Sequence, residues 1–277
     1  MQTNAKPIEQ QTVLITGATD GLGLKLAEMY AQRGATLLLH GRNEEKGKFI
    51  LEKLKQNTGN KTLKYFNADF SSLQSVRDLG AAVQKEYQNI DTLINNAGLG
   101  SGKTDIRNSS TEGYELLFTV NYLAPFLLTH LLLPQLHQAV TSKVINVVSR
   151  SQREINFDDL MLEQNYSGRQ AYAQSKLALI MFTFTLAGQS KDSKLRVNAV
   201  HPESLMNTKM VIEKYGSAET SVEAGADSIW HVATSPEVEN LTGAYFEKKE
   251  LSKAAGQAYD LSARDQLYRI SKQLVKI

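Results

Sequence analysis

Cysteine is absent from the whole sequence of 277 residues. This absence excludes a disulfide-stabilised scaffold, an iron–sulfur protein, a thiolate zinc site and a cysteine nucleophile. Histidine is scarce, with five residues, and neither a His-Glu-x-x-His pattern nor a close pair of histidines is present, which argues against a metal enzyme. We therefore expect any demanding chemistry to be carried by an organic cofactor.

An excess of one charge and long apolar runs are also missing. The 31 basic and 29 acidic residues nearly balance, so the chain lacks the composition of a nucleic-acid-binding protein. Residues 1–11 are polar and contain no apolar core of a signal peptide. The most apolar stretch, residues 120–136, is interrupted by polar residues and prolines and is shorter than the ~20 apolar residues of a membrane span. We expect a soluble, cytoplasmic protein with no membrane span and no nucleic-acid partner.

Short apolar runs alternate with helix-like segments along the chain. The runs are dense in Val, Ile and Leu, which is typical of a parallel sheet that helices cover on both faces. Seven strands are predicted, at residues 12–16, 36–40, 63–68, 92–95, 143–148, 196–200 and 243–246. Six helices are predicted, at residues 21–33, 43–56, 73–88, 111–137, 170–188 and 222–234, with Ser71, Thr111 and Ser221 as N-cap candidates. The pattern predicts an α/β fold: one domain over residues 1–277, with a doubly wound, seven-stranded parallel sheet and helices on both faces.

A glycine-rich segment directly follows the first predicted strand. Its spacing is Gly-x-x-x-Gly-x-Gly, with glycines at Gly17, Gly21 and Gly23, and it opens a helix. Gly17 permits a sharp turn, Gly21 lets the backbone approach a pyrophosphate, and Gly23 allows close packing of helix on strand. Backbone N–H groups at the start of the helix then face the phosphates, so the segment predicts a dinucleotide site of Rossmann type.

The end of the second strand predicts which dinucleotide binds. An acidic residue there would hold the ribose hydroxyls of NAD, whereas an arginine favours the 2′-phosphate of NADP. The sequence places Arg42 at this point and no carboxylate, and a guanidinium binds a phosphate through two hydrogen bonds. We therefore favour NADP(H) over NAD(H). Asp20, in the glycine segment, is an objection, because its carboxylate would repel a 2′-phosphate if it pointed that way.

A tyrosine and a lysine stand four residues apart at Tyr172 and Lys176, so on a helix they share one face. A phenol of pKa about 10 is a poor acid–base group at pH 7, and a neighbouring ammonium lowers that pKa. The same spacing recurs at residues 245/249 and 268/272, so the motif alone is not specific. Only Tyr172 follows the strand 143–148, which ends at Ser149, and parallel sheets bind ligands at the carboxyl ends of their strands.

In this order and spacing, the motifs resemble the short-chain dehydrogenase/reductase family over essentially the whole chain. The matching elements are Thr16-Gly17-x-x-x-Gly21-x-Gly23, Ala68-Asp69, Asn95-Asn96-Ala97-Gly98, Asn121, Ser149, Tyr172-x-x-x-Lys176 and His201-Pro202. The resemblance implies a Rossmann fold and, because the helices that hold Asn121 and Tyr172 form the dimer interface in many members, it also allows a homodimer.

The resemblance implies a role for each catalytic candidate. Tyr172 would be the general acid–base residue, Lys176 would lower its pKa and bind the nicotinamide ribose, Ser149 would hold the substrate oxygen, and Asn121 would position a water in the proton relay. Asp69 would contact the adenine, and Thr208 matches a threonine that often meets the nicotinamide carboxamide. The implied cofactor-binding set is Gly17, Thr19, Asp20, Gly21, Leu22, Gly23, Arg42, Asp69, Phe70, Asn95, Ala97, Gly98, Tyr172, Lys176, Pro202 and Thr208.

Two features indicate a branch of the family. The 23-residue separation of Ser149 from Tyr172 is wider than is common, and together with Arg42 it resembles the retinol dehydrogenase and protochlorophyllide reductase branch. The lack of cysteine argues against the light-driven reductase, and the lack of an N-terminal anchor argues for a soluble member. Three residues depart from the family pattern: Glu203 replaces a glycine after Pro202, Val148 replaces a frequent serine, and Asp20 stands where some NADP-dependent members are basic.

These features predict an NADP(H)-dependent oxidoreductase that interconverts an alcohol and a carbonyl. The loop at about 203–221 is expected to cover a small, apolar substrate, because it carries five apolar side chains, Leu205, Met206, Met210, Val211 and Ile212. Two alternatives stay open. One is a nucleotide-binding sensor or scaffold with vestigial catalysis, motivated by Glu203 and Asp20. The other is a carbon–carbon double-bond reductase of the protochlorophyllide type.

Overall fold

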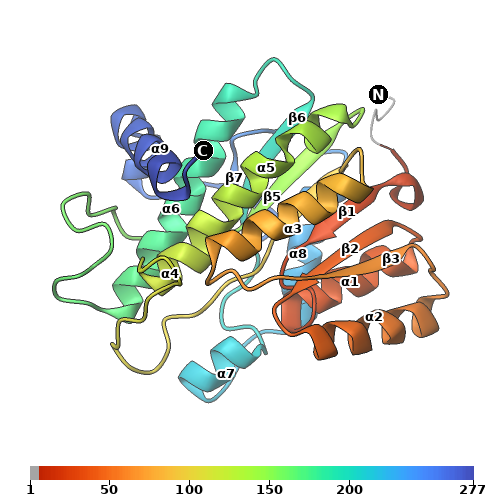
Figure 1. The fold of residues 1–277 in the computed structure, drawn as a ribbon, viewed down its shortest axis with the longest axis horizontal. Coiled ribbons are helices and arrows are strands. Elements are labelled where there is room, and N and C mark those ends of the chain that lie inside the picture. Colours follow the sequence, from red (N-terminus) through yellow and green to blue (C-terminus); the bar gives the residue numbers. More distant parts are fainter. Residues whose placement is uncertain (1–5) are drawn as a thin grey trace.

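The computed structural model describes residues 6–277, so the first five residues of the predicted domain and of its polar N-terminal segment lie outside it. Eight strands form one sheet in the order β3-β2-β1-β4-β5-β6-β7-β8 (Figure 1). Their bounds are β1 Thr12–Ile15, β2 Thr36–Gly41, β3 Leu63–Asn67, β4 Thr92–Asn95, β5 Ser142–Val147, β6 Leu195–His201, β7 Tyr245–Glu247 and β8 Glu250–Ser252. The order reverses between β1 and β4, which confirms the predicted doubly wound sheet.

The edge strand β8 is the departure from the predicted sheet. β1 to β7 are parallel, as predicted, but β8 pairs antiparallel with β7 through a tight turn in which Lys248 has a φ of 58°. The prediction of seven strands is therefore wrong by one. β8 has only three residues, and polar Glu250 and Ser252 flank its single apolar side chain, so it gives no apolar run.

Apolar side chains cover both faces of the sheet. In β1, Leu14 packs into one core, whereas Val13 and Ile15 pack into the other. The first core holds residues from α3, α5, α6 and α9, and the second holds residues from α1, α2 and α8. The helix bounds are α1 Gly21–Gln32, α2 Glu44–Thr58, α3 Leu73–Glu86, α4 Leu116–Phe118, α5 Ala124–Gln138, α6 Gly168–Gln189, α7 Lys209–Tyr215, α8 Val222–Thr234 and α9 Leu261–Val275. Three shorter elements are the 3-10 helices η1 Ile8–Gln10 and η3 Gly256–Tyr259 and the π-helix η2 Thr119–Leu123.

The predicted helix caps are partly correct. Ser221 caps α8 by accepting a hydrogen bond from the Ala224 N–H at 3.1 Å. The cap of α3 is Ser72 rather than Ser71. The predicted helix 111–137 begins too early, because Thr111 lies in a turn and the helical stretch starts only at Leu116.

The stretch Leu116–Gln138 combines α4, η2 and α5 and is the one helical segment among residues 6–277 that is long and apolar enough to cross a membrane. Most of it is buried inside the fold, where α5 packs against α3 and the sheet. It is therefore accounted for as a core helix of this α/β architecture.

The C-terminal helix α9 lies against α6 and closes the core on that side (Figure 1). The Tyr122 hydroxyl and Ser271 Oγ form a buried hydrogen bond of 2.7 Å, and His130 Nε2 lies 2.9 Å from the Tyr268 hydroxyl. α9 thus covers part of the surface of η2, α5 and α6, the helices through which the family resemblance allows a homodimer. A dimer through these helices would have to use what α9 leaves exposed.

Candidate active site

The glycine loop is locked onto the end of β4. Thr16 Oγ1 accepts hydrogen bonds from the N–H groups of Asn96 and Ala97, each at 3.0 Å, and Asn96 Nδ2 donates to the Thr16 carbonyl at 2.9 Å. Gly17 has a φ of +67°, and a Cβ on it would lie 2.9 Å from Ala97 Cα. Only glycine fits here, so Gly17 and Ala97 hold the loop in place. Asn96 was not in the predicted site, although it is part of the quoted Asn-Asn-Ala-Gly motif.

The first turn of α1 rests directly on this loop. A Cβ on Gly23 would lie 2.1 Å from the Gly17 carbonyl oxygen, which confirms the predicted close packing. Asp20 is the N-cap, and its Oδ1 accepts a hydrogen bond from the Gly21 N–H at 2.8 Å. The N–H groups that follow in this turn have no intrahelical acceptor, so the helix start can face an anion. Leu22 is buried in the core beneath the turn.

His40 is a buried residue of this site that the sequence motifs do not predict. Its Nδ1 accepts from the Gly17 N–H at 3.3 Å, its Nε2 donates to the Ala68 carbonyl at 3.0 Å, and its ring stacks on Phe70 at 4.3 Å. Burial lowers the pKa of His40 to about 4, so the ring is neutral at pH 7 and can serve both partners. The clue in the sequence is its position, because the last residues of β2 adjoin the glycine loop.

Two basic residues follow β2, Arg42 in the loop and Lys46 in α2, and they differ in their partners. Arg42 is exposed and makes no hydrogen bond or ion pair with any residue of the described range 6–277. Lys46, in the first turn of α2, forms an ion pair of 2.5 Å with Asp20 Oδ2. Thr19 packs the glycine loop against the end of β2. Its Cγ2 lies so close to Gly41 that a Cβ on this glycine would be only 2.7 Å away. Thr19, Asp20 and Arg42 therefore border one corner.

Two predicted cofactor residues have other roles in the structure. Asp69 Oδ1 accepts from the Ser71 N–H at 2.9 Å and so shapes the turn after β3, where the carboxylate is also exposed. Asn95 is buried within the sheet, and its Nδ2 donates to Thr129 Oγ1 at 3.1 Å and to Asn146 Oδ1 at 2.8 Å. The Asn95 side chain is therefore used inside the fold, because alternation along β4 directs it toward the helices.

The predicted catalytic residues come together at the carboxyl ends of β4 and β5. Lys176 is buried on α6, and its Nζ donates to the Val147 carbonyl at 3.1 Å and lies 5.8 Å from the centroid of the Tyr172 ring. A Cβ on Gly98 would lie 3.1 Å from Asn121 Oδ1 and 3.4 Å from Lys176 Nζ. Gly98, Asn121, Tyr172 and Lys176 thus share one corner of the site, and Ser149 stands at the end of β5 beside the Tyr172 phenol.

The pKa values in this cluster follow from burial. Burial lowers the pKa of Lys176 to about 8. Burial also raises the pKa of Tyr172 above its ordinary value, while a hydrogen bond with the Ser149 hydroxyl acts in the opposite direction. The net shift of the Tyr172 pKa is thus upward in this geometry, in which Lys176 Nζ is turned to the Val147 carbonyl.

Asn121 sits in the π-helix η2, where the regular helix is interrupted. Its Oδ1 accepts from the Leu99 N–H at 2.7 Å, and its Nδ2 donates to the Leu99 carbonyl at 3.0 Å and to Ser175 Oγ at 3.1 Å. The side chain therefore fixes the loop after β4 to α6. A π-turn is a frequent feature of functional sites, and the sequence gives no local signal for it.

A buried glutamate supports this π-helix and was not predicted. Both Glu115 oxygens cap the start of α4, because Oε1 accepts from the Leu117 N–H at 3.0 Å and Oε2 from the Phe118 N–H at 2.5 Å. The Tyr166 hydroxyl donates to the same Oε1 at 3.1 Å. Burial raises the pKa of Glu115, and the hydrogen bonds partly offset that effect. Glu115 thus joins α4, which directly precedes η2, to the segment before α6.

The predicted substrate loop contains α7, which projects from the lower edge of the fold in Figure 1. Thr208, the N-cap of α7, lies close to Gly21: a Cβ on Gly21 would be 3.4 Å from Thr208 Cγ2. Met210 packs on Gly100, Lys214 Nζ donates to Ser101 Oγ, and Tyr215 lies close enough to Tyr172 to raise its pKa. The loop therefore spans from the glycine loop to the catalytic corner.

Glu203 is paired beside this loop. Its Oε1 forms an ion pair of 2.6 Å with Lys248 Nζ from the β7–β8 turn, and its Oε2 accepts from the Ser204 N–H at 3.1 Å. Burial raises the pKa of Glu203, but the hydrogen bonds from Lys248 and the Ser204 N–H and the nearby positive charge together outweigh it, so the net shift is downward. The side chain that replaces the expected glycine after the buried Pro202 is thus held by charge pairing.

Comparison with known proteins decides the family. The model of short chain dehydrogenases matches residues 11–219. The chain belongs to the short-chain dehydrogenase/reductase family. Human retinol dehydrogenase 13 is 32% identical over 97% of this chain and 85% of its own length. The crystal structure of an uncharacterised protein from Mycobacterium paratuberculosis superposes with a TM-score of 0.81, at 28% identity, over 99% of this chain and 96% of its own.

A third similar protein was solved with a nucleotide. A short chain dehydrogenase from Shigella flexneri, in complex with NADP, has a TM-score of 0.70 and 25% identity over 88% of this chain and 100% of its own. Membership of this family makes the chain an NAD(P)-dependent oxidoreductase, and the predicted resemblance is confirmed.

Proposed function

We propose that this oxidoreductase uses NADP(H) to interconvert an alcohol and a carbonyl on a small, apolar substrate, with Tyr172 as the acid–base residue. The observation that carries the proposal is the cluster of Tyr172, Lys176, Asn121 and Ser149 at the carboxyl ends of β4 and β5. Parallel sheets bind ligands at this edge, and these four groups can hold and move a proton there.

The residues present fit a nicotinamide dinucleotide. The first turn of α1 offers backbone N–H groups above the clamped glycine loop, and exposed Arg42 stands at the end of β2 with no partner within residues 6–277. A guanidinium in this position can bind a phosphate on the adenine ribose through two hydrogen bonds. Arg42 therefore supports NADP(H) over NAD(H).

Each group of the catalytic corner has a proposed task. When bound, the nicotinamide supplies or accepts the hydride. The Tyr172 hydroxyl gives a proton to the carbonyl oxygen or takes one from the alcohol, and Ser149 holds that same oxygen. Lys176, with a pKa of about 8, supplies positive charge beside the phenol and can share its proton with water near Asn121.

The substrate is proposed to lie under α7. Met210 and Tyr215 from this helix flank the approach to Tyr172, and Ile212 adds a further exposed apolar side chain. These side chains favour an apolar alcohol or aldehyde. The name of the human relative suggests including retinal in the substrate panel.

The sensor alternative loses its motivation in the structure. It rested on Asp20 and Glu203, and both carboxylates are held in ion pairs, with Lys46 and Lys248. Nothing in the geometry favours the double-bond reductase over carbonyl chemistry.

Turnover of Tyr172→Phe tests the proposal. NADPH oxidation is followed with a panel of short and long aldehydes and ketones, and loss of the acid–base group is expected to lower turnover by about 100-fold or more. Tyr268→Phe is the matched control, because Tyr268 has the same Tyr-x-x-x-Lys spacing but lies on α9 against His130. Equal turnover of wild type and Tyr172→Phe would overturn the role of Tyr172.

A further inference from the structure

The carboxylate of Asp20 occupies the corner where the nucleotide's ribose phosphate is expected. It makes two contacts: Oδ1 accepts from the Gly21 N–H at 2.8 Å, and Oδ2 pairs with Lys46 Nζ at 2.5 Å. The first contact caps α1, and the second draws a lysine of α2 across the corner. Asp20 therefore ties together the two elements between which the adenine ribose would sit.

The orientation of this pair is set by its surroundings. Asn43, the N-cap of α2, accepts from the Lys46 N–H at 2.8 Å and fixes the first turn of that helix. The contact of Thr19 with Gly41 holds the glycine loop against the end of β2, where Arg42 follows. Lys46 and Arg42 thus enter one corner from adjacent elements, and both are suited to bind a phosphate.

The two cations differ in what they already bind. Arg42 has no partner among residues 6–277, whereas Lys46 is neutralised by Asp20. The hydrogen bond from Lys46 lowers the pKa of Asp20, so the carboxylate stays charged at neutral pH. A phosphate monoester with a charge of about −1.5 to −2 would therefore meet a rival for Lys46.

We propose that Asp20 is a specificity-determining residue, an internal competitor that holds Lys46 away from the ribose phosphate and so limits the preference for NADPH over NADH. The inference rests on the proposed function, because it takes the ribose phosphate to bind beside Arg42. Asp20, which departs from the family pattern, thus has a proposed role in nucleotide preference.

The test is the affinity of each nucleotide for Asp20→Asn, measured by titration calorimetry. Asparagine caps helices about as well as aspartate, so α1 keeps its cap while the charge is lost. Release of Lys46 and removal of the repulsion are expected to tighten NADPH binding by about fivefold to tenfold. NADH binding is expected to change by less than about twofold, and the gain should shrink at high salt.

The matched control is Glu44→Gln. Glu44 carries the same charge on the same helix but pairs with Lys48, at 2.6 Å, one turn along. Its loss is expected to change NADPH affinity by less than about twofold, because Glu44 pairs with Lys48 and does not hold Lys46. In the double variant Asp20→Asn/Lys46→Met, most of the gain in NADPH affinity should disappear, because the lysine that Asp20→Asn releases is absent.

The outcomes separate this inference from the proposed cofactor. If the wild type binds NADPH no more tightly than NADH, the proposed NADP(H) preference fails. If the wild type prefers NADPH but Asp20→Asn leaves that preference unchanged or weakens it, Asp20 is not a competitor and the inference is overturned. Should Asp20→Asn fold poorly, as its melting temperature would reveal, Asp20→Ser, another N-cap residue, gives the same reading.

Discussion

Lys143, which is partly buried, and Lys176, which is buried, lie at opposite ends of strand β5, and their surroundings differ. At the amino end, Lys143 Nζ donates to the Ala233 carbonyl at 2.6 Å, in the last turn of α8. At the carboxyl end, Lys176 Nζ donates to the Val147 carbonyl at 3.1 Å. Burial lowers the pKa of both, that of Lys176 to about 8. By burial and bonding alone, either lysine could be called functional.

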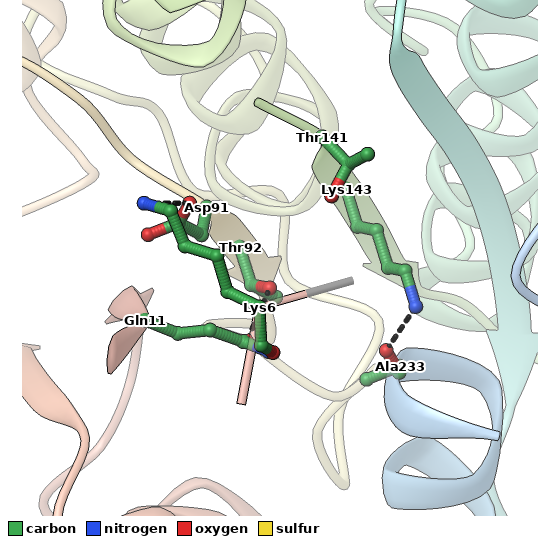
Figure 2. A pocket seen from close by; sticks show the side chains of 7 residues that line it. All are labelled: Lys6, Gln11, Asp91, Thr92, Thr141, Lys143 and Ala233. Atoms are coloured by element: carbon green, nitrogen blue, oxygen red, sulfur yellow. Dashed lines mark hydrogen bonds and ion pairs between the residues drawn. The ribbon is translucent and has the colours of Figure 1, made fainter. Parts of the chain in front are cut away.

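The neighbours decide between them. In the small pocket around Lys143 (Figure 2), the charged groups already have partners within the protein. Asp91 accepts a hydrogen bond from the Thr12 N–H at 2.8 Å and forms an ion pair with Lys6 at 2.8 Å. The helix end beside Lys143 also favours a cation. At the other end, Lys176 adjoins the Tyr172 ring, and Arg42, which has no partner among residues 6–277, follows β2 at the same carboxyl edge of the sheet. The amino end stabilises the fold, whereas the carboxyl end keeps groups available for ligands.

Replacing each lysine by methionine gives the largest expected contrast. Lys176→Met should lower turnover of the best aldehyde by about 100-fold, because the charge beside the acid–base residue is lost. Lys143→Met should leave turnover within about twofold, since no reacting group lies at that end. Steady-state kinetics of the two purified variants, with circular dichroism to verify folding, make the comparison. Similar losses in both variants would erase the distinction between the two ends.

The pH dependence of stability sharpens the comparison at Lys176. Its pKa is about 8 in the folded chain against 10.5 for a free side chain. Between these values the unfolded chain binds more protons, so this group makes the fold more stable as the pH rises and less stable below pH 8. At pH 7 the buried Lys176 lowers the free energy of unfolding by about 3 kcal/mol. At pH 9.5 this destabilisation is smaller by about 2 kcal/mol.

Urea unfolding of wild type and Lys176→Met measures this effect. The free energy of unfolding of Lys176→Met, relative to wild type, should be higher at pH 7 than at pH 9.5 by about 2 kcal/mol. A difference that stays constant over this range would show that the lysine has an ordinary pKa.

The smallest effect is expected at the amino end. Asp91→Ala removes the acceptor of the partly buried Thr12 N–H and the partner of Lys6, so we expect a loss of about 2 kcal/mol in the free energy of unfolding. Asp91→Asn keeps an oxygen acceptor and should lose less. Thermal unfolding and turnover are measured together, and a fall in turnover at unchanged nucleotide affinity would mean that the amino end is not purely structural.

The sequence predicts those parts of the molecule that local pattern determines. Dense apolar runs give the seven parallel strands, and the glycine spacing gives the phosphate loop, because Gly17 and Gly23 each stand where a Cβ would clash. The polar edge strand β8 has no such pattern. The catalytic corner was predicted from motif order, and its residues are brought together by the fold.

What could not be predicted depends on partners distant in sequence. His40 joins Gly17 to Ala68, Glu115 caps α4 and accepts a hydrogen bond from Tyr166, and the pairing of Asp20 with Lys46 spans 26 positions. The contacts of the Asn95 side chain could not be predicted, because a motif names the residue but not the face of the strand on which its side chain lies. The sequence lists these groups, and only the fold shows what each one contacts.

The central claim is that the carboxyl end of the sheet binds NADPH through Arg42. Calorimetric affinities of NADPH and NADH for wild type and Arg42→Ala test it most directly. Because a bidentate, charge-assisted contact would be lost, NADPH should bind about 10- to 100-fold more weakly to the variant, while NADH should change by less than about twofold. Unchanged NADPH affinity in Arg42→Ala would contradict the account.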